Sequence, residues 1–125
     1  MVGKSPSQAE TEILQALWDR GRATVREIHD DILEHRQVGY TTTLKQVQRL
    51  EKKGLVERVA SDGRSHRFRA TAKPQRTRSA LLDRLIRTAF DGSTGTLVLH
   101  ALGRKKPSKE QIAEIRALLD KLDDE

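Results

Sequence analysis

Apolar residues recur at helical spacing near the start of this 125-residue chain, in two stretches separated by a short connection. Each stretch opens on a capping box, in which a Ser or Thr side chain and a Glu three residues later satisfy free amides of the first turn. The boxes are Ser7 to Glu10 and Thr24 to Glu27, and Gly21 ends the first helix. The residues that then share one face are Ile13, Leu14, Leu17 and Trp18 in the first helix and Ile28, Ile32 and Leu33 in the second. The pattern predicts two short amphipathic helices before residue 40.

The stretch "YTTTLKQVQRLEKKG" predicts a third helix over about residues 41–53. At roughly 100° per residue, Leu44, Val47 and Leu50 share one face. Thr41 or Thr42 can cap the start, and Gly54 suits the left-handed position just past the end. The side chains that face away from the apolar stripe are hydrogen-bond donors rather than mixed charges: Thr42, Lys45, Gln46, Arg49 and Lys53. Taken alone, this stripe fits a solvated helix face as well as a binding surface.

Two β-compatible runs follow the third helix, at about residues 55–59 and 65–70. They flank "SDGR", in which Asp62-Gly63 is a strong signal for a tight hairpin turn. The hairpin is basic, because residues 61–69 include Arg64, His66, Arg67 and Arg69. Three short helices followed by a basic hairpin have the layout of a winged helix-turn-helix domain, which we expect over residues 1–73.

The remaining residues, 74–125, predict a helical region after a break at Pro74. Ser108 to Gln111 forms a third capping box, which opens the last helix. The apolar faces expected here are wider than one small unit can cover: Leu81, Leu82, Leu85, Ile86, Phe90, Ile112, Ile115, Leu118, Leu119 and Leu122. Either these faces fold back onto the N-terminal core or they form a dimer interface; we prefer a two-fold homodimer. The overall fold class is then mainly α with a small β-hairpin.

Charge is concentrated in the middle of the chain. The net charge is +6 and the pI is about 10, yet residues 41–76 alone hold 10 Lys and Arg against 3 Asp and Glu, a net of +7. Such a localised excess favours a binding surface for an acidic partner, with nucleic acid first. The chain has no cysteine, so disulfides and thiolate metal sites are excluded. No run reaches the ~20 apolar residues of a membrane helix, so we expect a cytoplasmic protein.

Catalytic and metal sites are not indicated. The four histidines have no ligand spacing, and the carboxylates lie on amphipathic helices or at the acidic C-terminus without an apolar pocket. We therefore expect no enzyme activity, no metal and no cofactor.

Double-stranded DNA suits the donor stripe best. The start of the third helix would enter the major groove, where threonines contact phosphates or thymine methyl groups, Gln46 pairs with adenine, and Lys45 or Arg49 contacts guanine or phosphate. The expected DNA-binding residues are Thr41, Thr42, Thr43, Lys45, Gln46, Arg49, Arg64 and Arg67. A winged helix that binds RNA or another protein is the alternative, and it would lack a palindromic footprint.

The sequence resembles the penicillinase-repressor family of winged-helix regulators, the BlaI/MecI/CopY group. The resemblance rests on "AETEILQALWDRGRATVREI", "YTTTLKQVQRLEKKGLVERV", "GRSHRFRA", "FDGSTGTLVLHAL" and "SKEQIAEIRALL", which occur in the family's order. It implies a dimeric repressor that binds operator DNA through its N-terminal domain, with Thr41, Thr42, Lys45, Gln46 and Arg49 on the recognition helix, and dimerises through its C-terminal helices.

Two departures from the family pattern are visible. Several members are inactivated by proteolysis linked to a membrane sensor-protease, at an Asn-Phe pair that corresponds here to His100-Ala101. That difference argues against cleavage at this point. The copper-responsive members carry a C-terminal cysteine cluster, which this chain lacks, so copper sensing by that route is not expected.

Overall fold

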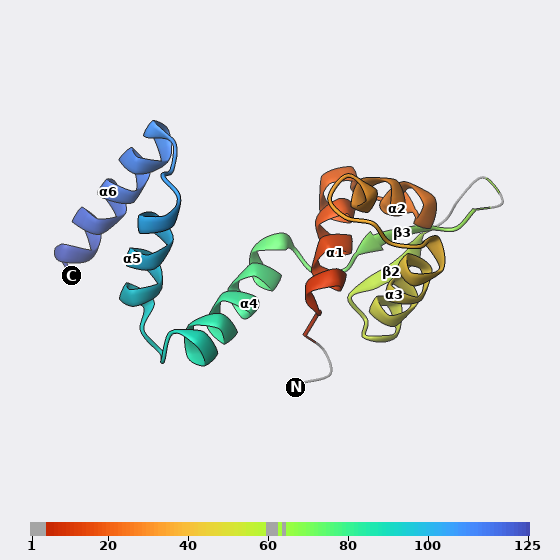
Figure 1. Ribbon diagram of the computed structural model, residues 1–125, viewed down its shortest axis with the longest axis horizontal. Coiled ribbons are helices and arrows are strands. Elements are labelled where there is room, and N and C mark those ends of the chain that lie inside the picture. The colour runs from red at the N-terminus through yellow and green to blue at the C-terminus, as the bar shows by residue number, and fades with distance from the viewer. Residues whose placement is uncertain (1–4, 60–62, 64) are drawn as a thin grey trace. The chain divides into compact units, whose positions relative to one another are not determined.

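The computed structural model describes residues 5–59, 63 and 65–125, and in that part the chain forms six α-helices and three short strands (Figure 1). In chain order the elements are α1 Gln8–Arg20, β1 Ala23–Thr24, α2 Val25–Leu33, α3 Tyr40–Lys52, β2 Val56–Val59, β3 Arg67–Ala70, α4 Pro74–Ala89, α5 Thr94–Arg104 and α6 Lys109–Asp123. The expected fold class, mainly α with a small β-hairpin, is confirmed.

The helices α1, α2 and α3 pack around one aliphatic core. Its most deeply buried members, all at most 2% exposed, are Ile13, Leu14, Leu17, Ile28, Ile32, Val47, Leu50 and Val56. The predicted capping boxes are present: Glu10 N–H donates to Ser7 Oγ at 3.1 Å, and Glu27 N–H donates to Thr24 Oγ1 at 3.1 Å. Because these boxes satisfy free amides of the first turn, they define where α1 and α2 begin.

A three-stranded antiparallel sheet, in the order β1-β3-β2, closes one side of this core. The predicted hairpin is confirmed in its strands, since Val56 pairs with Ala70 and Val59 with Arg67. Phe68 on β3 points inward and is 4% exposed. The third strand, β1, was not predicted from the sequence. The turn residue Asp62 and the wing residue Arg64 lie outside the described residues.

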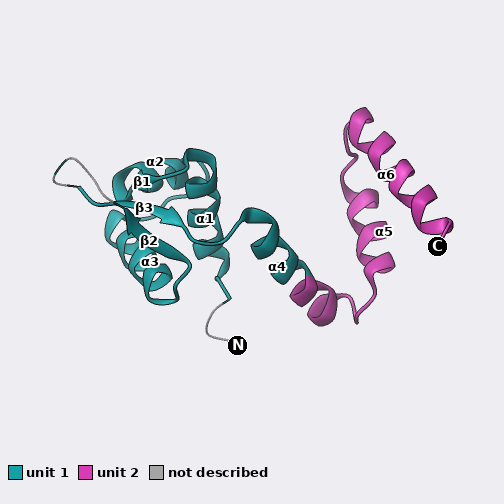
Figure 2. Cartoon of the chain, turned by 180° about the vertical axis from the view of Figure 1, so that it is seen from behind, with its two compact units in different colours: residues 1–82 teal, residues 83–125 magenta. Residues whose placement is uncertain are grey.

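The chain divides into two compact units, residues 1–82 and 83–125 (Figure 2). The division falls within α4, whereas we expected the boundary before this helix, at residue 74. The start of α4 belongs to the first unit because it contacts α1. The indole N–H of Trp18 donates to the Ala72 carbonyl at 3.1 Å, the guanidinium of Arg78 lies 5.8 Å from the Trp18 ring centre, and Thr77 is 7% exposed.

The second unit contains the end of α4 together with α5 and α6. Its last helix begins at the predicted capping box, with Gln111 N–H donating to Ser108 Oγ at 3.1 Å. No side chain of α5 or α6, both of which the structure describes throughout, is buried. None of the helices in the described part of the chain is long and apolar enough to span a membrane.

Candidate nucleic-acid interface

The polar face of α3 is open to solvent, as its amphipathic pattern predicts. Thr41, Thr42, Lys45 and Arg49 are all exposed. Gln46 is half-buried, and its Oε1 atom is shielded from solvent without a hydrogen-bond partner among the described residues. A contact between Gln46 and adenine therefore needs a change of side-chain rotamer. The exposed face continues through Gln48 and Lys52 toward the end of the helix.

Thr43 does not belong to this surface, and the prediction that it contacts DNA is wrong. Its side chain is completely buried and its Oγ1 lies 2.9 Å from Nδ1 of His29, which is 5% exposed. Two buried polar groups satisfy each other here, which removes the cost of leaving either without a partner. Thr43 thus joins α3 to α2.

The start of α3 also differs from the prediction. The N-cap residue is Gly39, which makes no side-chain cap, so neither Thr41 nor Thr42 caps the helix. Residues of α2 hold the first turn instead. The Arg26 guanidinium lies 4.4 Å from the centre of the Tyr40 ring, and the His29 ring meets the same ring edge-on at 5.6 Å. Such a cation–π contact is worth about 0.5–2 kcal/mol.

The predicted C-terminal signal of α3 is confirmed. Gly54 has φ of 79°, in the left-handed region, and its N–H donates to the Glu51 carbonyl at 3.0 Å. The N–H of Leu55 donates to the Leu50 carbonyl at 2.9 Å. This pair of bonds is a Schellman motif, in which glycine adopts the left-handed conformation at no steric cost. The turn directs the chain from α3 into β2.

A buried carboxylate lies beneath the far end of α3. Glu10 is fully buried and accepts a hydrogen bond from Lys53 Nζ at 2.7 Å, while an Arg49 guanidinium nitrogen lies 4.0 Å from its other oxygen. Burial alone would raise the pKa of Glu10, but hydrogen bonds from Lys53 and Ser7 and the Lys53 charge outweigh it and hold this pKa below its usual value. Lys53 therefore anchors α3 to α1, while Arg49 stays 60% exposed in its side chain.

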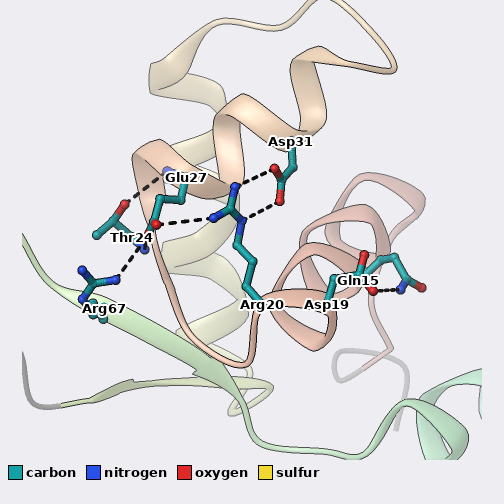
Figure 3. A network of polar contacts seen from close by, with 7 residues as sticks. All are labelled: Gln15, Asp19, Arg20, Thr24, Glu27, Asp31 and Arg67. Atoms are coloured by element: carbon teal, nitrogen blue, oxygen red, sulfur yellow. Dashed lines mark hydrogen bonds and ion pairs between the residues drawn. The ribbon is translucent and has the colours of Figure 1, made fainter.

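The hairpin strand β3 is joined to the helices through a second carboxylate (Figure 3). Glu27 accepts from the Thr24 amide at 2.9 Å, from Arg67 at 3.2 Å and from Arg20 at 3.4 Å. Arg20 in turn donates to both oxygens of Asp31 at 2.8 Å. The Thr24 amide bond is the largest cause that lowers the pKa of Glu27, and the Arg20 hydrogen bonds lower that of Asp31. Arg67, a predicted DNA contact, is thus already paired, although its side chain remains 43% exposed.

A hollow of about 380 Å³ lies between the start of α2, the exposed face of α3 and the wing strands. Its polar lining includes Arg26 of α2, Arg58 of β2 and His66, which directly precedes β3. Tyr40, Leu44 and Phe68 contribute the apolar part of its wall. From α3 the hollow is lined by Tyr40, Leu44 and Gln48, so it lies beside the donor stripe rather than beneath it.

Residues 6–121 match the family model described as "Penicillinase repressor". The chain belongs to this family. Its sequence is 30% identical over 97 residues to the transcriptional regulator BlaI of Mycobacterium tuberculosis, covering 76% of this chain and 70% of that protein. It is 24% identical over 115 residues to the methicillin resistance regulatory protein MecI of Mammaliicoccus sciuri, covering 92% and 93% of the two chains.

The fold is also found in solved structures of lower sequence identity. A crystal structure of a mutant MarR from E. coli superimposes with a TM-score of 0.52 at 19% identity, covering 93% of this chain and 76% of that one. NadR in complex with 4-hydroxyphenylacetate gives a TM-score of 0.51, also at 19% identity, with 93% and 73% covered. The relatives in the penicillinase repressor family are transcriptional regulators rather than enzymes, which confirms the class expected from the sequence.

The apolar residues predicted for dimerisation lie on α4, directly after it at Phe90, and on α6. Leu82, Leu85, Leu118, Leu119 and Leu122 are 45–56% exposed. Leu81, Ile86, Phe90, Ile112 and Ile115 are half-buried. The five exposed leucines give this chain an apolar surface that water solvates poorly.

His100 and Ala101, the pair that the family resemblance predicts at the cleavage position, are both exposed and lie inside α5. The His100 ring contacts Phe90 edge-on at 5.9 Å. Proteolysis concentrates at exposed loops, so α5 would have to unwind locally before this peptide bond could enter a protease site.

Sequence reasoning missed three polar contacts that shape the interface: those of Thr43 with His29, Glu10 with Lys53, and Glu27 with Arg67. Helical periodicity could have indicated the first of these contacts, because it places Thr43 on the buried face of the helix. With Leu44 at zero, Thr43 falls at roughly 260°, between Leu50 and Val47 on the buried face. The other two join residues 43 and 40 positions apart, for which a single sequence has no local signal.

Proposed function

We propose that this chain is a homodimeric repressor that binds a pseudo-palindromic operator, with α3 in the major groove and the wing on the flanking backbone. The single observation that carries the proposal is the exposed donor face of α3, formed by Thr41, Thr42, Lys45 and Arg49. This face lies in the most basic segment of the chain. Membership of the penicillinase repressor family supports the same function.

The contacts fall into two groups by position on α3. Thr41, Thr42 and Lys45 lie in its first two turns, where side chains reach base edges and phosphates. Arg49 lies further along, above Glu10 at the start of α1. Gln46 lies between them and would turn its amide outward to read adenine, a contact that discriminates by about 1–3 kcal/mol.

The wing contributes charge rather than sequence reading in this proposal. His66 and Arg58 line the hollow beside α3, and Arg67 keeps part of its guanidinium exposed while it pairs with Glu27. Contacts of this kind to phosphate make binding fall steeply with salt concentration. Arg64 is the remaining candidate of the wing.

Dimerisation through the second unit would present two copies of α3 to one duplex. The exposed leucines of α4 and α6 support this step. Burying them would remove apolar surface from water, and the favourable free energy of that burial is about 25 cal/mol per Å². Half-site centres would then lie about 34–36 Å apart, or a multiple of that spacing. Repression follows when the dimer occupies a promoter and excludes polymerase.

Selection of bound sites from random duplex DNA tests the proposal. We expect a two-fold symmetric motif, together with a steep salt dependence of the dissociation constant. The Gln46→Ala variant should lose preference at one base position, and Arg49→Ala should reduce the salt slope by about 1. Gln75→Ala, an exposed glutamine of α4, serves as the matched control. Failure to enrich any motif at low salt would leave RNA or protein binding as the better account.

A further inference from the structure

The second unit holds many charges that no neighbour neutralises. Among the described residues, every ion pair joins side chains between Glu10 and Arg69, and none involves residues 83–125. The apolar stripe of α6 is equally uncovered, since Leu118, Leu119 and Leu122 are 53–56% exposed. A helix with both an open apolar stripe and unpaired charges has the composition of a helix–helix interface.

The charges around α6 differ in net sign between its two ends: residues 104–110 hold four cations and one anion, Glu110, and residues 120–125 hold four anions and one cation, Lys121. Before and at its start lie four cations, here called the basic turn: Arg104, Lys105, Lys106 and Lys109. At its end lie four anions, here called the acidic tail: Asp120, Asp123, Asp124 and Glu125. The helix dipole favours anions at the N-terminus and cations at the C-terminus, so Glu110 and Lys121 suit it, whereas the net charge at each end is unfavourable for the helix by itself. The pattern therefore does not serve the stability of an isolated α6.

The basic turn and the acidic tail of one chain cannot reach each other through α6. The helix has 15 residues, which corresponds to a length of about 22 Å. A second copy that runs in the opposite direction places each acidic tail beside the basic turn of its partner. The helix dipoles then also oppose each other, which is the favourable arrangement.

The charges on the two flanks of the apolar stripe also fit an antiparallel pair. With Ile112 at zero, the stripe covers roughly 240–360°. One flank, at roughly 20–80°, carries in order the charges of Lys109, Arg116, Asp120 and Asp123. The other flank, at roughly 160–200°, carries those of Glu110, Glu114 and Lys121. In a two-fold antiparallel pair, each flank lies beside the same flank of the partner helix, which runs in the opposite direction. Cations of one copy therefore lie beside anions of the other on both flanks.

We propose that α6 pairs with α6 of a second copy in antiparallel orientation, through its leucine stripe, with each basic turn against the partner's acidic tail. The inference rests on the homodimer of the proposed function and specifies how that dimer is oriented. A parallel pair would also match the flanks, but it would bring the two basic turns together at one end and the two acidic tails together at the other. Like charges at both ends disfavour it.

Charge reversal at the two ends tests the orientation. The turn variant carries Lys105→Glu and Lys106→Glu, and the tail variant carries Asp123→Lys and Asp124→Lys. Both changes improve the match to the dipole of α6, but the turn variant also places anions just after the C-terminal end of α5, where Lys105 is the cap residue. Circular dichroism checks that helix content is kept.

Sedimentation equilibrium of the full chain then measures the dissociation constant of the dimer, and native mass spectrometry measures which chains the dimers contain. In an antiparallel pair, each variant alone should dimerise more weakly, on the order of tenfold at low salt. Mixing the turn and tail variants should restore dimers of mixed composition. Placing both changes in one chain should restore the homodimer, and high salt should reduce all of these differences.

Other outcomes overturn the inference. A parallel pair predicts no weakening in either variant and a preferred mixed dimer between the wild-type chain and the chain with all four reversals. Weakening by the tail variant alone would mean that the tail pairs with other cations, such as Arg84 and Arg87. If the wild-type chain stays monomeric at high concentration, the homodimer of the proposed function fails, which is a different result from a dimer of the wrong orientation.

Discussion

Replacing Thr43 by valine tests whether α3 is held by its contact with α2. Valine has nearly the shape of threonine but lacks the hydroxyl, so the change removes the 2.9 Å contact with His29 and leaves the volume almost unchanged. Both residues are buried, at 0% and 5% exposure, so water cannot replace the lost partner. The net value of such a bond is about 1 kcal/mol, and a buried group left without a partner costs about 1–3 kcal/mol.

We therefore expect Thr43→Val to lower the free energy of unfolding by about 1–3 kcal/mol. Urea unfolding of the full chain measures this difference, at one fixed protein concentration because dimerisation shifts apparent stability. The slope of unfolding with urea should stay unchanged, which indicates that only stability has moved.

Thr42→Val is the matched control, since Thr42 is the neighbouring residue on α3 and is exposed. Its effect should stay within about 0.5 kcal/mol. Adding His29→Leu to Thr43→Val should cost less than the sum of the two single changes, because the contact can be lost only once. Equal costs for the two threonine variants, or strict additivity with His29→Leu, would refute the argument.

Three further effects follow from buried or paired side chains of the first unit. Glu10→Gln should destabilise the fold by about 1–3 kcal/mol in urea unfolding, less than for a fully buried pair because Lys53 is partly exposed; a change no larger than that of Gln75→Ala would contradict it. The pKa values of Glu10, Glu27 and Asp31 are lowered by folding, so the stability they contribute is complete above about pH 5 and is lost as pH falls below about 4. Acid titration followed by circular dichroism should show that loss, and it should shrink in Glu27→Gln. Leu50→Ala, at a fully buried position, should cost about 2–5 kcal/mol, whereas the exposed Leu99→Ala should cost far less in the same assay.

Local sequence chemistry predicted the starts of α1, α2 and α6 and the ends of α1 and α3. Ser7, Thr24 and Ser108 cap their helices as expected, because a capping box needs only residues three positions apart. Gly54 takes the left-handed conformation that only glycine adopts easily. The hairpin strands followed from two β-compatible runs on either side of a turn signal.

Features that depend on distant partners were not predictable in the same way. β1 is only two residues long and exists because Ala23 and Thr24 pair with β3, more than forty positions along the chain. α3 begins without a side-chain cap, and its first turn instead contacts α2 through Arg26 and the Tyr40 ring, which is a tertiary contact. Helical periodicity assigned Lys53 to the donor stripe, yet it is paired with a carboxylate from α1.

Trp18 is the only tryptophan in the sequence, and it lies where the chain leaves the first unit. Its indole N–H is bonded to the Ala72 carbonyl, and the Arg78 guanidinium lies over its ring. Indole emission responds to both a hydrogen bond and a nearby cation. Trp18 is therefore an intrinsic fluorescent probe beside the start of α4. The wavelength of its emission should show whether its contacts with Ala72 and Arg78 persist during the proposed pairing with another copy or binding to a DNA duplex.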